Sequence, residues 1–91
     1  MLAARFNSAA AVGLAAVRRD QKRTGDAIGL CEKVLAQGFD AAAATVIAAC
    51  YMDLGDRPLA EKWAALAVGH TGGDPRALAV LMANRAKAKG S

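Results

Sequence analysis

Aromatic residues make up only 4% of this 91-residue chain, and histidine occurs once. His70 stands beside glycines at the expected end of a helix, where it would cap backbone carbonyls rather than act as a base. The sequence shows no nucleophile–base pair, and Gly72-Gly73 lacks the lysine of a phosphate-binding loop. We therefore expect a protein that is not an enzyme and uses no cofactor.

Cysteine is also scarce, since Cys31 and Cys50 are the only two. They lack the CxxC spacing and the second histidine of a zinc site. Both fall on apolar helical faces, which predicts buried free thiols, with a disulfide or a reactive thiol as alternatives. Unpaired thiols fit a reducing compartment, so we expect a cytoplasmic location.

Long uncharged apolar runs are missing as well, which predicts that no segment spans a membrane. The first 19 residues contain no acid and are rich in alanine and arginine. This composition predicts a first helix, but it also describes an organellar transit peptide. If residues 1–23 were such a targeting segment, the protein would belong in an organelle matrix; a membrane-surface role for the same residues is a further alternative.

The charges are unevenly distributed along the chain, whose net charge is +4. Residues 1–25 and 76–91 each carry a net charge of +4, whereas residues 26–75 carry −4. Arg18, Arg19, Lys22 and Arg23 form a compact cluster that could bind RNA or a ribosome. Asp20 lies within that cluster and no aromatic residue interleaves for base stacking, so nucleic acid is the alternative partner rather than the first expectation.

Alanine accounts for nearly half of the 55% hydrophobic content, and runs such as 41–44 are pure alanine. Alanine has the highest helix propensity but buries little apolar surface per residue. A chain of this length forms one domain with a small core. The composition therefore favours closely packed helices, whose stability is supplemented by a partner or a second copy.

Glycine, proline and capping residues divide the chain into helices. Thr24, Asp40 and Asp74 are placed to cap helix starts, Gly38 to end a helix, and Pro58 to occupy a first turn. Between these signals apolar residues recur every three or four positions, as in an α-helix, and no alternating run indicates a strand. The predicted apolar faces include Ala44, Ile47, Ala48 and Tyr51; then Leu59, Trp63, Leu66 and Ala67; then Leu78, Leu81 and Met82. The prediction is an all-α fold with helices over 3–22, 25–37, 41–54, 57–69 and 75–88.

Equivalent signals recur at an interval of about 34 residues, as between Asp40 and Asp74. A two-helix unit of this period is typical of tetratricopeptide repeats (TPRs). Within residues 44–75 the chain resembles that repeat through Ile47-Ala48, Tyr51, Gly55, Ala60, Ala67 and Pro75. It departs from the pattern at Ala44, where the repeat has tryptophan, and at Ala64, where it has an aromatic residue. The alternative is an unrelated alanine-rich helical bundle.

The resemblance implies one TPR-like domain over 1–91: a short right-handed solenoid of antiparallel hairpins. Its parts would be a weak repeat at 8–40, a better one at 41–74, and a C-terminal capping helix at 75–88. In such repeats the first helix of each pair lines a concave groove that binds a partner. Carried onto this chain, the groove would be lined by Val12, Ala16, Arg19, Ala42, Thr45, Ala49, Met52, Arg76, Ala79 and Ala83, with Ala9 at one end.

These residues predict a shallow groove that holds a helical or extended segment of a partner, with Arg19 and Arg76 binding its carboxylates. The expected function is that of an adaptor or chaperone-like subunit of a complex, similar to small secretion chaperones. The last helix would leave Leu78 and Leu81 exposed, which predicts association with a protein partner or with a second copy.

Overall fold

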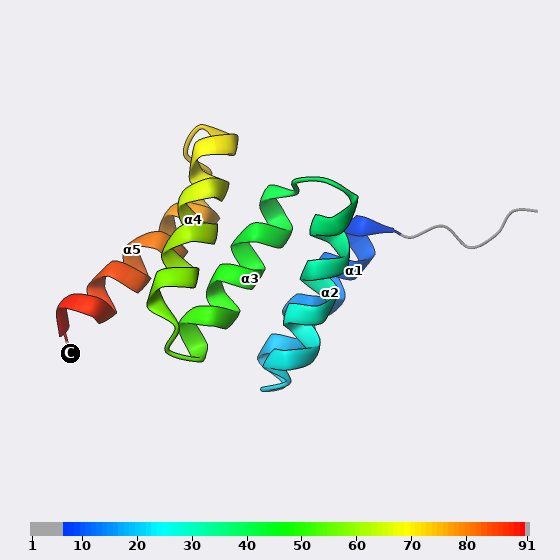
Figure 1. Cartoon of the computed structure of the whole chain (residues 1–91), viewed down its shortest axis with the longest axis horizontal. Coiled ribbons are helices and arrows are strands. Elements are labelled where there is room, and N and C mark those ends of the chain that lie inside the picture. Colours follow the sequence, from blue (N-terminus) through cyan, green and yellow to red (C-terminus); the bar gives the residue numbers. More distant parts are fainter. Residues whose placement is uncertain (1–6, 91) are drawn as a thin grey trace, which may run out of the picture.

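The structure is a computed structural model that describes residues 7–90, with side chains described to residue 87. It is all-α, as predicted, and no strand occurs in the described residues. Its helices are α1 (Ser8–Asp20), α2 (Thr24–Gln37), α3 (Ala41–Asp53), α4 (Arg57–Thr71) and α5 (Pro75–Gly90) (Figure 1). The predicted start of the first helix at residue 3 lies outside the described residues. The other helix ends differ from the predictions by no more than a few residues.

Short connections arrange these helices as antiparallel hairpins, α1 with α2 and α3 with α4 (Figure 1). Each loop has three residues: 21–23, 38–40, 54–56 and 72–74. A loop of three residues forces the following helix to run antiparallel along the helix before it. Helix α3 occupies the centre and contacts all four other helices, whereas α5 contacts only α3 and α4.

Most helices begin at a polar side chain that accepts a hydrogen bond from the first turn. The acceptors are Asn7 for α1, Asp40 for α3, Asp56 for α4 and Asp74 for α5. The predicted caps at Asp40 and Asp74 are therefore confirmed, as is the first-turn position of Pro58. Each acceptor satisfies a backbone N–H that has no partner within its helix.

The prediction that Thr24 caps the second helix is wrong. Thr24 is the first residue inside α2, and the cap position is held by Arg23, whose side chain makes no capping hydrogen bond. Lys22, with φ of 65°, turns the chain one residue earlier than expected. The Arg23 guanidinium instead binds Asp26 in the first turn, with Nη2 to Oδ2 at 2.8 Å.

Gly38 ends α2 in a backbone conformation that favours glycine, with φ of 143° and ψ of 166°. We expect Gly38→Ala to lower the free energy of unfolding by about 1–3 kcal/mol, because side chains other than glycine's strain this backbone. A Cβ would meet nothing within 4 Å there, so the cost comes from the backbone alone. Urea unfolding followed by circular dichroism measures it.

Gly29 provides the matched control, since it lies inside α2 and a Cβ there also meets nothing within 4 Å. Gly29→Ala should raise the free energy of unfolding by about 0.5–1 kcal/mol through helix propensity. Equal effects of the two substitutions would contradict the special role given to the Gly38 conformation.

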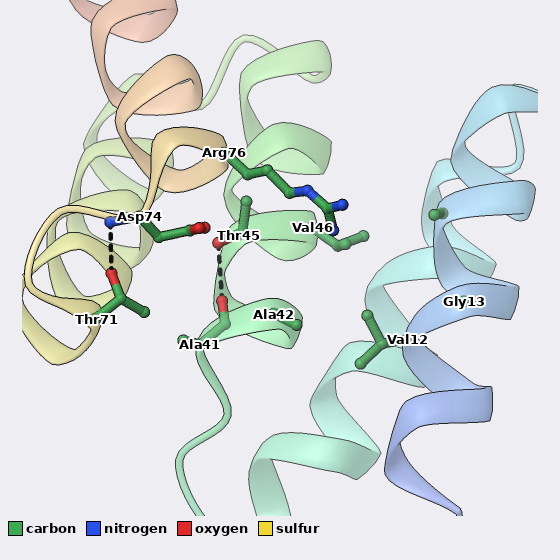
Figure 2. Close-up of a pocket in the computed structure, with 10 residues that line it drawn as sticks. Val12, Gly13, Ala41, Ala42, Thr45, Val46, Thr71, Asp74 and Arg76 are labelled. Atoms are coloured by element: carbon green, nitrogen blue, oxygen red, sulfur yellow. Dashed lines mark hydrogen bonds between the residues drawn. The ribbon is translucent and has the colours of Figure 1, made fainter.

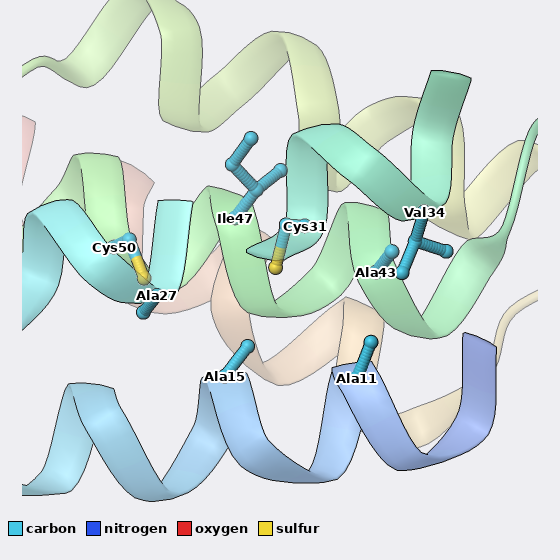
Figure 3. Packing of buried hydrophobic residues seen from close by; sticks show 8 residues of the cluster. All are labelled: Ala11, Ala15, Ala27, Cys31, Val34, Ala43, Ile47 and Cys50. Atoms are coloured by element: carbon cyan, nitrogen blue, oxygen red, sulfur yellow. The ribbon is translucent and has the colours of Figure 1, made fainter. Parts of the chain in front are cut away.

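The core consists mainly of small side chains at the places where the helices meet. Around Ile47 and Val34, its largest fully buried side chains, the main cluster joins α1, α2 and α3 (Figure 3). Two smaller clusters join α3, α4 and α5: Ala44 with Ala67 and Ala77, and Ala48 with Ala64 and Leu81. Methyl groups at these contacts let the helix axes approach closely, at a modest gain in buried area.

The apolar faces predicted for α3 were correct, but those of the last two helices were partly wrong. Leu66 of α4 is exposed, while Ala60, Ala64 and Ala67 of that helix are buried. In α5, Leu81 is buried although it was expected to be exposed, and Leu78 and Met82 face solvent. Tertiary contacts select the smaller alanine stripe because α3 and α4 pack too closely for larger side chains.

Candidate functional site: a groove along three helices

A continuous groove runs along α1, α3 and α5. It consists of two hollows, of about 470 and 320 Å³, which share Ala16, Thr45, Val46 and Arg76 as lining residues. The first hollow extends to the start of α3 and the loop before α5 (Figure 2). The second continues toward the C-terminal end of α1.

The groove follows from the order of the helices. Three-residue loops place α1, α3 and α5, the first helices of successive hairpins, next to one another. Nearly half of the positions on these helices that line the hollows are alanine or glycine, as at Gly13, Ala42 and Ala79. Side chains of this size cannot fill the space between neighbouring helices, so a depression remains.

Eight of the ten predicted groove residues line these hollows. They are Val12, Ala16, Arg19, Ala42, Thr45, Ala49, Arg76 and Ala79. The remaining two, Met52 and Ala83, lie outside both hollows and are partly buried. The predicted positions on α1, α3 and α5 are thus brought together over most of their length.

Several lining residues were not predicted: Gly13, Asp20, Ala41, Val46, Thr71, Asp74 and Val80. Val46 and Val80 follow the predicted positions Thr45 and Ala79 directly. A prediction based on a fixed repeat spacing does not include such neighbouring residues. Thr71 and Asp74 come from the end of α4 and the loop before α5, a part of the hairpin that a rule based on first helices does not include.

Arg19 does not present a free guanidinium to the groove. Its Nε donates to Oδ2 of Asp53 at 2.7 Å, and its Nη2 donates to Oδ1 at 3.1 Å. This bidentate ion pair joins the C-terminal ends of α1 and α3. The hydrogen bond to Asp53 raises the pKa of Arg19. Asp53 thus takes the Nε donor and one Nη2 donor of Arg19, and a partner's carboxylate would have to use the remaining N–H groups or compete with Asp53. Binding of a partner's carboxylate by Arg19 stays a prediction.

Arg76 is the basic side chain that the groove leaves available. It is exposed on the first turn of α5 and has no ion pair or side-chain hydrogen bond within the described part of the chain. Figure 2 shows its guanidinium extending over the hollow beside Val46. It can therefore bind an anionic group without first breaking an internal pair.

The hydroxyl groups at the groove are already used in helix ends and turns. Thr45 Oγ1 donates to the carbonyl of Ala41 at 2.8 Å. Thr71 Oγ1 donates to the carbonyl of Ala67 at 2.7 Å and accepts from the N–H of Asp74 at 2.9 Å. The surface offered to a ligand is consequently mostly methyl groups, with charge supplied by Arg76 and by carboxylates at the edges.

The prediction that His70 caps the end of α4 is wrong. The helix runs on to Thr71, whose hydroxyl takes that role. The imidazole of His70 instead stacks on Phe39 of the loop before α3, with ring centroids 4.0 Å apart and an interplanar angle of 24°. This contact ties the α2–α3 loop to α4.

Neither a metal centre nor a membrane-spanning helix is found in residues 7–90. No group of three or more histidine, cysteine or acidic side chains is arranged to hold a metal ion in that part of the chain. None of the described helices has both the length and the apolar character needed to cross a bilayer. The chain matches no protein-family model, no curated protein and no solved structure.

Proposed function

We propose that this protein is a non-enzymatic protein-binding module that holds a helical or extended segment of a partner in the groove along α1, α3 and α5. The observation that carries the proposal is the continuous hollow rich in small side chains, with Arg76 at its edge and in no ion pair with any described residue. Alanine and glycine let a partner's backbone approach the helices closely, and Arg76 can bind a carboxylate on the segment.

The arrangement of helices supports a TPR-like adaptor or chaperone-like role. Repeated helical hairpins present the first helix of each pair on a common surface, and such surfaces bind extended partners. The hairpins formed by α1 with α2 and α3 with α4, followed by α5, fit that pattern. A cytoplasmic location is part of the same proposal, because two unpaired buried thiols suit a reducing compartment.

Nucleic-acid binding through the basic cluster at residues 18–23 receives less support from the geometry. Arg19 pairs with Asp53, and Arg23 pairs with Asp26. Arg18 donates to the side chain of Gln21 at 3.0 Å. Phosphate would have to compete with these contacts, which leaves Lys22 as the main available cation. RNA binding that is already absent at low salt would eliminate this alternative.

Site-specific photo-crosslinking in the native source tests the proposal. A photoreactive side chain at the exposed groove position Ala16 or Ala79 should crosslink to a defined partner protein. The same group at Ala36 on α2, which is exposed and outside the groove, serves as the control. We expect the partner to be recovered from the groove positions and not from the control.

The recovered partner is then purified and titrated against the full chain. Ala79→Trp should weaken its binding at least about tenfold, because an indole fills the space the partner needs. Arg76→Glu should weaken it further if the segment carries a carboxylate. Equal crosslinking from Ala36, or unchanged affinity for the Ala79→Trp protein, would contradict groove binding.

A further inference from the structure

A further hollow, of about 420 Å³, lies on the first hairpin, between the C-terminal half of α1 and the N-terminal half of α2 (Figure 1). It shares no lining residue with the groove. Leu14 lines this hollow and Ala16 lines the groove. Residues two positions apart in an α-helix point to nearly opposite sides. The two sites therefore lie on opposite sides of α1, and we call the new one the α1–α2 hollow.

Apolar and basic side chains come together in the α1–α2 hollow. Leu14 is 41% exposed there, and Leu30 is partly buried against the main cluster. The charged lining residues are three bases and one acid, which give a net charge of +2: Arg18, Arg23, Lys33 and Asp26. The hollow thus offers an apolar contact surrounded by positive charge.

Most of this positive charge is not compensated within the described residues. Lys33 is exposed and forms no ion pair there. Arg18 donates from Nη1 to Oε1 of Gln21 at 3.0 Å, but that acceptor is neutral and leaves the charge in place. Asp26 offsets only Arg23, with Nη2 to Oδ2 at 2.8 Å. Lys33 and Arg18 are therefore left to attract an anionic ligand.

A second copy of this chain has no cluster of free acids to offer the hollow. All eight acidic residues lie in the described part of the chain. The remaining two after ion pairing and helix capping, Asp20 and Glu32, lie on different helices. The others are the paired acids Asp26, Asp53 and Glu61 and the capping acids Asp40, Asp56 and Asp74. The complementary acid must come from a different molecule.

Among anionic molecules, an acidic protein segment matches the lining best. The phosphates of a nucleic acid would meet Asp26 and two leucines, and no aromatic side chain lines the hollow for base stacking in the described structure. A flat bilayer surface cannot enter a concave site to reach Leu30. A protein segment supplies both carboxylates and an apolar side chain.

We propose that the α1–α2 hollow binds an acidic segment of a partner protein. An apolar side chain of that segment packs against Leu14 and Leu30, and its carboxylates bind Lys33 and Arg18. Because the hollow and the groove lie on opposite sides of α1, the protein can hold two segments at once. The proposal does not depend on groove binding.

Three synthetic peptides of about 12 residues test the chemistry of the occupant. The first combines glutamates with a central pair of leucines, the second replaces the glutamates by lysines, and the third replaces the leucines by serines. Each is titrated against the full chain by fluorescence anisotropy at about 50 mM and about 500 mM salt. At the lower salt concentration we expect the first peptide to bind at least about tenfold more tightly than the second and severalfold more tightly than the third.

Two pairs of variants localise the binding. Lys33→Glu should weaken binding of the first peptide about tenfold, whereas Lys87→Glu, the same charge change at an exposed position of α5, should have only the smaller effect of net charge. Leu14→Gln should weaken it severalfold, whereas Leu54→Gln, also exposed but outside the hollow, should not. Circular dichroism confirms that each variant is folded.

Equal affinity for the glutamate and lysine peptides, or no binding of the first peptide at about 1 mM, would overturn the proposal. So would binding that Ala79→Trp abolishes and Lys33→Glu leaves unchanged, since that result would place the peptide in the groove. Tighter binding of a single-stranded RNA of about 12 nucleotides, or of phosphatidylserine vesicles, in competition with the first peptide would assign the hollow to that ligand instead. A dimer in sedimentation that Lys33→Glu removes would assign it to a second copy.

Discussion

Replacing Ala64 by leucine is expected to lower the free energy of unfolding by about 2–3 kcal/mol, which for a domain of this size lowers the melting temperature by about 10–20 °C. Ala64 is fully buried on α4, in a cluster with Ala48 of α3 and Leu81 of α5. The added carbons have no space to occupy, so α4 must shift away from both neighbours. Thermal unfolding followed by circular dichroism measures the loss.

Ala65→Leu is the control for this substitution, because it makes the same change one residue further along α4 at an exposed position. Leucine and alanine are both strong helix formers, so we expect a change within about 0.5 kcal/mol. Equal destabilisation by the two substitutions would mean that close approach of α3, α4 and α5 does not hold this end of the protein together.

Cys31 and Cys50 are expected to react with a thiol reagent at pH 8 at least about a hundredfold more slowly in the folded protein than in the unfolded chain. Both are fully buried and neither is in a disulfide, as predicted. Burial raises the pKa of Cys31 to about 12 and that of Cys50 to about 11, although the positive charge of Arg19 acts in the opposite direction on Cys50.

The reactive species is the thiolate, which these environments suppress in addition to blocking access. Absorbance of the released thiol product with and without urea gives the two rates. A fast reaction of the native protein, with one or both thiols, would show that the contact between α2 and α3 opens readily. It would also contradict the packing of the main cluster (Figure 3).

The same pKa shifts make stability depend on pH. The folded protein keeps both thiol protons at pH values where the unfolded chain has begun to lose them, from the ordinary value of about 9 upward. Stability is therefore complete below pH 9 and falls as the pH rises from 9 toward 11, by up to about 1.4 kcal/mol per pH unit for each thiol. Burial also raises the pKa of Tyr51, which adds to the fall in the same direction.

Urea unfolding at pH 8 and pH 10.5 measures this dependence. The variant with Cys31→Ala and Cys50→Ala should retain only the part due to other groups, such as Tyr51. An undiminished fall in that variant would show that the thiols are not the source.

Local signals allowed the helices to be located from the sequence. Asp40, Gly38 and Pro58 act on the backbone within a few residues of themselves, by accepting N–H groups, by adopting a positive φ or by lacking a donor. Thr24 was misassigned because a side chain that can cap a helix caps it only if the preceding turn places it there. Lys22 has a positive φ and turns the chain so that Arg23, not Thr24, occupies the cap position of α2.

The groove was largely predictable for a related reason. A repeat of about 34 residues places equivalent helices side by side, and eight of ten positions carried over by that spacing line the hollows. The repeat spacing does not predict the ion pair between Arg19 and Asp53. These residues are 34 positions apart, and only the packing of α1 against α3 brings them within 2.7 Å.

The sequence by itself determined that residues 7–90 form five helices with small residues on their inner faces, because capping and helix propensity depend on neighbours in the chain. The tertiary structure decided which apolar residues are buried and which charges remain free. Ala64 is enclosed while Leu66 and Met82 are exposed. Among the described residues, Arg19 forms an ion pair with Asp53, whereas Arg76 forms none. Burial and ion pairing depend on how closely the helices approach one another, and that distance is set by side chains from distant parts of the chain.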